Sequence, residues 1–188
     1  MTIACIITRY NEHIDWIDYI QNDIDIFYIY NKGSNNHLFK NLVPTESLKN
    51  KLNIIVLPNI GRIDHTLAYH IIQNWDSLEE TIVSLPASIL MCHLKGSYLS
   101  AIRKRLLVVK NQYHGFYSPR FHKVDNTFNY TIDNYQAEGS CNRNNNKFIK
   151  SEYPDFQTWK AAIIDAIPMK YVGMRGMFVV NRENIKHI

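Results

Sequence analysis

Polar segments follow three apolar runs of the sequence, at the point where each run would end as a buried strand. These segments are "TRYNE" at residues 8–12, "YNKG" at 30–33 and "PNIGR" at 58–62. In open α/β sheets, ligands bind in the crevice outside the carboxyl ends of the strands. The first two segments therefore predict ligand contacts by Arg9, Asn11, Glu12, Asn31 and Lys32, although Asn, Lys and Gly also form simple turns.

The segment "LPNIGRIDHTLAYHIIQNW", residues 57–75, predicts a helix from about 62 to 75. Helical spacing gives one polar stripe of Arg62, His65, Thr66 and Tyr69, and an opposite apolar stripe of Ile63, Leu67, Ile71 and Trp75. A helix start after Gly61 would offer free N–H groups to a phosphate, and Arg62 would add a bidentate donor. The alternative is an ordinary amphipathic surface helix.

The elements that must position these residues alternate between strand and helix patterns. Apolar runs predict strands at 3–8, 26–30, 52–57 and within "SILMCHLKGS" at 88–97, while Ile14, Ile17, Ile20 and Ile24 recur at helical spacing. Residues 155–167 favour a helix, and "YVGMRGMFVVNRENI" predicts a last strand followed by a helix from Asn181 or Arg182. Alternating strands and helices predict an α/β fold with a mostly parallel sheet.

Composition indicates a folded globular protein. The 188 residues are 46% hydrophobic and 20% charged, and they predict a single domain over residues 1–188. The last predicted helix is cut off at Ile188, so we expect a piece of a longer protein. The scattered net charge of +4 favours a small anionic ligand over nucleic acid. The basic cluster in "IRKRLLVVK", residues 102–110, could touch nucleic acid, but a solvated helix face explains it better.

The cysteines Cys5, Cys92 and Cys141 are odd in number and lack CxxC spacing, which argues for a reducing compartment and a cytoplasmic location. No apolar run approaches the roughly 20 residues of a membrane span, so we expect none. The motifs HExxH, GxSxG, GxxxxGK[ST] and GxGxxG are absent. His93 is a weak candidate for a metal ligand, since a lone histidine beside an apolar run is more often structural.

Four segments together resemble a known but uncharacterised domain family. They are "TRYNEHIDWI", "YIYNKG", "LPNIGRIDHTLAYHII" and "GMRGMFVVNRENI", and they carry Arg-Tyr-Asn-Glu, Tyr-Asn-Lys-Gly and Gly-Arg-x-x-His-Thr in the family's order. The similarity covers most of the chain and is weakest between about residues 97 and 165. This family is in turn similar to GT-A glycosyltransferases, notably a viral domain involved in capsid glycan synthesis. The resemblance implies a GT-A-like three-layer sandwich around a mostly parallel sheet.

The resemblance also implies a glycosyltransferase of the hexosyltransferase type, with a nucleotide-diphosphate sugar donor and a glycan or protein acceptor. For a UDP-sugar, uridine would lie near Thr8, Arg9, Asn11 and Glu12, and the diphosphate near Lys32, Arg62 and the helix start. The donor-binding set implied in this way is Thr8, Arg9, Asn11, Glu12, Asn31, Lys32, Gly61, Arg62, His65, Thr66, Lys95 and Arg175.

One departure from the GT-A pattern concerns the metal. GT-A enzymes usually carry an Asp-x-Asp motif after the fourth strand that binds Mn²⁺ or Mg²⁺, whereas the expected position here reads "HLKGS". Arg62, Lys95 and Arg175 could instead stabilise the departing diphosphate, because that charge develops in the transition state. Loss of catalysis is the alternative, which would leave a nucleotide- or glycan-binding module.

An inverting transfer needs a carboxylate that accepts the proton of the acceptor hydroxyl. The available candidates are Asp64, Glu138, Glu152 and Asp155. Asp155 and Asp64 are the preferred choices, and Asp155 precedes a predicted helix that contains Trp159. An N-cap role for Asp155 is an equal alternative.

Overall fold

A computed structural model describes residues 1–60, 62–91, 95–109, 116–119, 121–123, 158, 162, 171–173 and 176–186. The chain divides into two compact units, one of Met1–Arg120 with Gly173–Ile188 and one of Phe121–Val172. The expectation that residues 1–188 form one domain therefore stays a prediction. The candidate site and the main sheet belong to the first unit.

The first unit is built on a six-stranded sheet with the order β3-β2-β1-β4-β8-β5. Its strands are β1 (Ile3–Arg9), β2 (Ile26–Asn31), β3 (Leu52–Val56), β4 (Thr81–Pro86), β5 (Phe116–Tyr117) and β8 (Phe178–Asn181). Strands β1 to β4 pair in parallel, whereas β8 is antiparallel to β4 and to β5. The predicted α/β fold with a mostly parallel sheet is confirmed. A separate two-stranded sheet pairs β6 (Phe121–Lys123) with β7 (Tyr171–Gly173).

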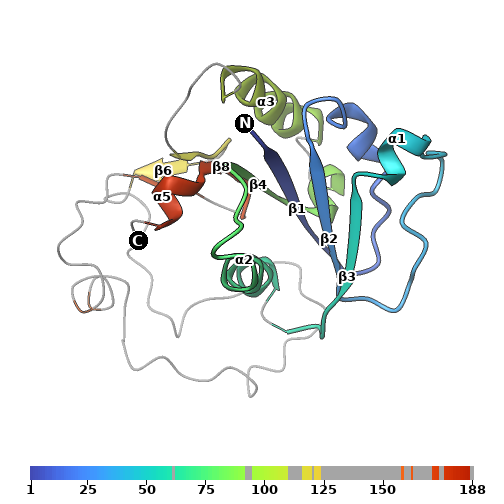
Figure 1. The fold of residues 1–188 in the computed structure, drawn as a ribbon, viewed down its shortest axis with the longest axis horizontal. Helices are drawn as coiled ribbons and strands as arrows, with labels where there is room; N and C mark the ends of the chain where they lie inside the picture. The colour runs from blue at the N-terminus through green and yellow to red at the C-terminus, as the bar shows by residue number, and fades with distance from the viewer. Residues whose placement is uncertain are drawn as a thin grey trace. The chain divides into compact units, whose positions relative to one another are not determined.

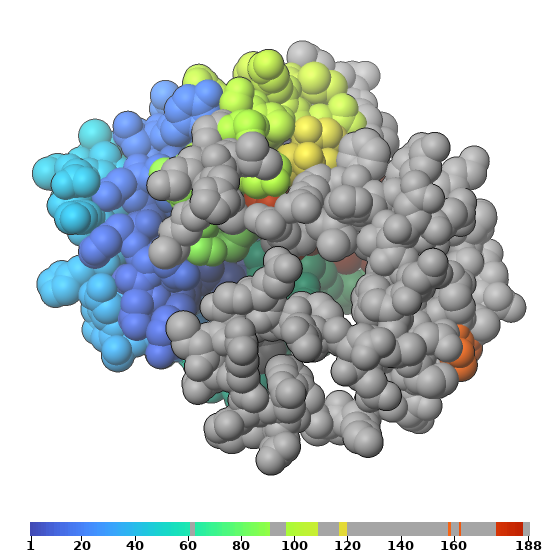
Figure 2. Space-filling model, turned by 180° about the vertical axis from the view of Figure 1, so that it is seen from behind, coloured from blue at the N-terminus to red at the C-terminus, as the bar shows by residue number. Residues whose placement is uncertain are grey.

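Helices cover both faces of this sheet because successive side chains of each strand point to opposite faces. On one face, Cys5, Ile7 and Val83 pack with η1 (Asp15–Tyr19), α1 (Glu46–Lys49), η2 (Ala87–Met91) and α3 (Lys95–Val109). On the other face, Ile6 and Ile82 pack with α2 (Arg62–Gln73) and α5 (Arg182–Lys186). Figure 1 shows α2 and α3 on opposite sides of the sheet. In Figure 2, the blue N-terminal residues adjoin the green residues of η2 and α3.

The fourth strand lies earlier than predicted. Strand β4 is Thr81–Pro86, and residues 88–91 of the strand predicted within 88–97 belong to η2. Lys95 begins α3 and does not end a strand. The sequence from 81 to 92 is one nearly continuous apolar run, and periodicity alone cannot divide such a run between strand and helix. The segment that follows β4 is therefore "ASILM" and not "HLKGS".

The prediction of a helix through the isoleucines at 14, 17, 20 and 24 is also wrong, except for one short turn. A 3₁₀-helix spans only Asp15–Tyr19. The Asp15 carboxylate accepts hydrogen bonds from the backbone N–H groups of residues 40–42, which fixes the chain to a distant loop. Burial raises the pKa of Asp15, but these backbone N–H groups outweigh it and the pKa lies below its ordinary value.

Other predicted elements agree with the structure. The strands at 3–8, 26–30 and 52–57, the helix from 62 and the final strand and helix are all present. Of the helix predicted at 155–167, only Thr158 and Ala162 lie within the described residues, and both are helical. Among the helices that the structure describes, none has the length and apolar character needed to cross a membrane.

Candidate functional site

The carboxyl ends of β1 and β2 meet at one edge of the sheet, as predicted. Arg9 and Asn31 are partners in the parallel register, as are Thr8 and Tyr30. The loop after β1 contains Asn11 and Glu12, and the loop after β2 begins with Lys32 and Gly33. The candidate residues taken from these two strand ends therefore gather in one place.

Arg9 is the centre of this edge and has no exposed surface. Its guanidinium makes four hydrogen bonds: Nε donates to the Glu12 carbonyl (2.7 Å), Nη1 to Asn31 Oδ1 (2.6 Å) and the Asn35 carbonyl (2.5 Å), and Nη2 to the His37 carbonyl (3.0 Å). Burial lowers the pKa of Arg9, and the nearby charge of Glu12 acts in the opposite direction. The Arg9 guanidinium is thus buried and hydrogen-bonded to groups of the protein on three of its nitrogen atoms.

Asn11 and Glu12 also organise the loops around Arg9. Glu12 Oε2 accepts hydrogen bonds from the backbone N–H groups of Tyr10 (2.8 Å) and Asn11 (3.1 Å). Asn11 Oδ1 accepts from the backbone N–H of Asn35 at 3.0 Å. Both side chains remain partly exposed, so they can contact a ligand while they hold the loops.

Lys32 connects this edge to the turn that enters α2. Its backbone N–H donates to the Arg9 carbonyl at 2.8 Å, and its ammonium donates to the Ile60 carbonyl at 2.6 Å. The side chain is only 8% exposed, and burial lowers its pKa. Helix α2 begins at Arg62, two residues after Ile60, so the buried Lys32 ammonium lies beside the entry to the helix N-terminus.

Gly33 allows the two loops to approach each other. A Cβ atom at this position would lie 1.6 Å from the Tyr10 carbonyl oxygen and 2.4 Å from Asn11 Oδ1. No side chain fits in that space, because both contacts are far shorter than van der Waals separation. The Tyr-Asn-Lys-Gly segment therefore needs its glycine for close backbone approach.

Helix α2 does not present the polar stripe as a unit. Thr66 is fully buried on the face that packs against the sheet, whereas Asp64 is exposed in the first turn. His65 is partly buried and its Nδ1 atom has no hydrogen-bond partner. The predicted apolar stripe is wrong at Trp75, which follows the helix and is 44% exposed. Ile63, Leu67 and Ile71 are partly buried.

The strand order reverses direction between β1 and β4, because β2 and β3 lie on one side of β1 and β4 lies on the other. Ligands of doubly wound sheets bind at such a switch point. Thr8 and Pro86 pair there, and Thr8 Oγ1 is a buried hydroxyl without a hydrogen-bond partner. This places Thr8 where a ligand would be expected.

The residues near this point do not fit the metal site of GT-A enzymes. The segment after β4, Ala87–Met91, contains no carboxylate. Within the described part of the chain, no group of three or more His, Cys, Asp or Glu side chains could hold a metal ion. We therefore assign no step of the chemistry to a metal.

A buried polar network beneath α2 was not predicted. Tyr30 Oη lies 2.8 Å from His70 Nδ1, His70 Nε2 lies 3.7 Å from Glu79 Oε2, and Tyr28 donates to Glu79 Oε1 at 2.6 Å. Burial and the Glu79 carboxylate raise the pKa of Tyr28 to about 12. No local pattern predicts this network, because Tyr28 and Glu79 are 51 residues apart and Tyr30 and His70 are 40 residues apart.

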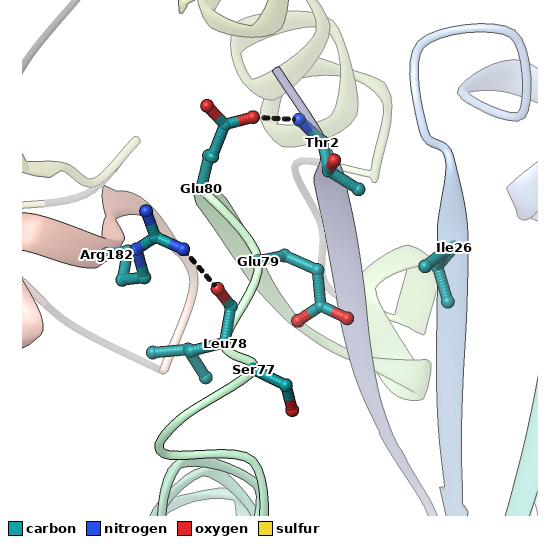
Figure 3. Close-up of a pocket in the computed structure, with 7 residues that line it drawn as sticks. All are labelled: Thr2, Ile26, Ser77, Leu78, Glu79, Glu80 and Arg182. Carbon is teal, nitrogen blue, oxygen red and sulfur yellow. Dashed lines mark hydrogen bonds between the residues drawn. The ribbon is translucent and has the colours of Figure 1, made fainter.

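A pocket of about 440 Å³ lies at the opposite, amino edge of the sheet (Figure 3). It is lined by Thr2, Ile26, Ser77, Leu78, Glu79, Glu80 and Arg182. Within this pocket, Glu80 accepts from the Thr2 backbone N–H and Arg182 donates to the Leu78 carbonyl. We favour the carboxyl edge as the site because the loops and the helix N-terminus converge there.

Two arginines of the basic cluster on α3 make contacts within the protein. Arg103 donates to Asp23 at 3.2 Å and lies 5.0 Å from the ring centroid of Tyr19, and Arg105 stacks on Tyr117 at 5.2 Å. These contacts favour the interpretation of this segment as an ordinary helix face over a nucleic-acid surface. Cys5 is fully buried, and burial raises the pKa of its thiol.

Several predicted site residues belong to parts of the chain that the structure does not describe. Gly61, His93, Glu138, Glu152, Asp155 and Arg175 lie outside the described residues, as do Cys92, Cys141 and Trp159, and the side chains of Arg62 and Lys95 are not described. Gly176, next to Arg175, lies against Ile63 in the first turn of α2. No protein-family model, curated protein or solved structure matches this chain.

Proposed function

We propose that the chain is a GT-A-like glycosyltransferase that uses a nucleotide-diphosphate sugar. The observation that carries the proposal is the convergence of Thr8, Asn11, Glu12 and Lys32 beside the start of α2, at the switch point of a mostly parallel sheet. Partly exposed amide and carboxylate groups suit a nucleoside. The Lys32 ammonium and the N-terminal end of α2 suit a diphosphate.

In this proposal the acceptor oxygen forms a bond to the anomeric carbon while the bond from that carbon to the diphosphate oxygen breaks. The leaving diphosphate keeps the electron pair, and Lys32, Arg62 and the N–H groups of α2 stabilise its charge. A carboxylate takes the proton of the acceptor hydroxyl. Asp64, exposed in the first turn of α2, and Asp155 are the candidates, although an acid in a first turn also stabilises its own helix.

A thermal-shift panel of nucleoside diphosphates and nucleotide-sugars, each with and without Mn²⁺, tests the proposal. At 100 times the dissociation constant, a ligand stabilises the folded state by roughly 2.7 kcal/mol. For a domain of this size, we expect the melting temperature to rise by about 5–10 °C with one base. Absence of a shift with every compound would refute the donor site.

The variant Arg62→Ala should reduce this shift while the protein without ligand melts within a few degrees of the parent. Lys49→Ala is the matched control, since it removes an exposed lysine from α1 on the other face of the sheet. If both variants retain the full shift, the diphosphate lies elsewhere. If Arg62→Ala does not fold, the polar positions of α2 are structural.

A second candidate is a non-catalytic nucleotide- or glycan-binding module. The segment after β4 favours it, because Ala87–Met91 offers no carboxylate for a metal. Slow release of free sugar from a bound donor in the absence of acceptor distinguishes the two functions. A transferase should hydrolyse its donor at a low rate, and a binding module should return it intact.

A further inference from the structure

We propose that Arg9 is a positioning residue that joins the loops after β1 and β2 into one rigid unit, and that it does so without touching a ligand. The inference rests on the proposed function, because the loops that Arg9 joins form the proposed donor site. It replaces the expectation that Arg9 contacts the nucleotide. It follows from the burial of the guanidinium and from the positions of its partners along the chain.

The four acceptors of Arg9 lie on the loop after β1, at the end of β2 and on the loop after β2. The Glu12 carbonyl belongs to the loop after β1, Asn31 ends β2, and the Asn35 and His37 carbonyls belong to the loop after β2. The Asn11–Asn35 and Lys32–Arg9 hydrogen bonds, the hydrogen bond from the Ile14 N–H to the Leu38 carbonyl and the close approach of Gly33 also connect these loops. Arg9 therefore holds Asn11 and Glu12, the exposed members of the site, at a fixed distance from Lys32.

Lysine cannot replace this arrangement. The guanidinium is planar and directs its N–H donors in a fixed fork, whereas an ammonium is a compact point charge with a different reach. In Arg9→Lys, some of the four acceptors would lose their donor inside the protein, and a buried group without a partner is costly. The loops should then open locally more often than the rest of the sheet.

Hydrogen exchange measured by mass spectrometry tests the proposal on the full chain. For Arg9→Lys, we expect amide exchange in residues 10–12 and 31–38 to become at least tenfold faster relative to exchange in α3. Val83→Ala is the control, because it removes buried surface from β4 and leaves the four hydrogen bonds of Arg9 intact. Val83→Ala should instead accelerate amide exchange by similar factors in the two loops and in α3. The same exchange pattern in both variants would overturn the proposal.

UDP serves as the probe of site geometry. Titration should show at least tenfold weaker binding to Arg9→Lys and nearly unchanged binding to Val83→Ala. If UDP does not bind the parent protein, the proposed function fails, but the exchange experiment still decides the role of Arg9. If Arg9→Lys does not fold, Asn31→Ala removes one acceptor of Arg9 and should give the same local pattern with a smaller amplitude. Unchanged local exchange in Asn31→Ala would then overturn the proposal.

Discussion

Gly33→Ala should destabilise the protein by about 3 kcal/mol or more, a large part of the stability of a typical domain. The added Cβ atom would lie 1.6 Å from the Tyr10 carbonyl oxygen. That oxygen is backbone, so relief requires the loops after β1 and β2 to separate. Separation would stretch the hydrogen bonds that Arg9 makes to residues of both loops. Urea unfolding followed by circular dichroism measures the effect.

Gly176→Ala is the matched control for this prediction. Gly176 has a φ of +61°, and its added Cβ atom would meet Ile63 Cγ2 at 2.6 Å. The left-handed backbone costs a non-glycine residue about 1–2 kcal/mol, and the side chain of Ile63 can move. We therefore expect a smaller loss than at Gly33. Equal losses in the two variants would show that the approach of Gly33 to Tyr10 is not a tight constraint.

The parts of the fold that could be predicted are those with clear boundaries in the sequence. Strands β1, β2 and β3 are short apolar runs that end in polar, Gly-containing or Pro-containing turns, and α2 follows such a turn. Strand β4 lacked such a boundary, because Pro86 is followed at once by the apolar residues of η2. The predicted strand was therefore displaced toward the C-terminus.

The positions of the site residues could be predicted, but their burial could not. Parallel pairing alone brings Arg9 next to Asn31, since the ends of β1 and β2 share one edge. Whether Arg9 faces solvent depends on the end of β2 and the loop that follows it, because Asn31, Asn35 and His37 supply three of its acceptors from 22 to 28 residues away. No local pattern encodes such contacts. Exposed and buried arginines look alike in the sequence.

The network of Tyr28, Tyr30, His70 and Glu79 was missed for the same reason, and it leads to the second prediction. Glu79 is 8% exposed and accepts a hydrogen bond from Tyr28 at 2.6 Å. Burial by itself raises the pKa of Glu79, but the interactions with His70 and Tyr28 outweigh it, so the pKa lies below its ordinary value of 4.5. The ionised carboxylate therefore stabilises the folded state.

Glu79→Gln should destabilise the protein by about 1.5–3 kcal/mol at pH 7, as expected for loss of hydrogen bonds to a charged group. Because the folded pKa is depressed, this contribution is fully present above the unfolded pKa of about 4.5 and is lost as the pH falls through the folded value. The stability difference between parent and variant should thus shrink below about pH 4. Denaturant unfolding across pH 3–8 measures it, with Glu80→Gln as the control. Glu80 is the adjacent residue and its carboxylate is exposed, so Glu80→Gln should change the stability less. Added salt should reduce that change further. A difference for Glu79→Gln that stays constant with pH would contradict the prediction, because it would mean that the pKa of the carboxyl is the same in the folded and unfolded protein.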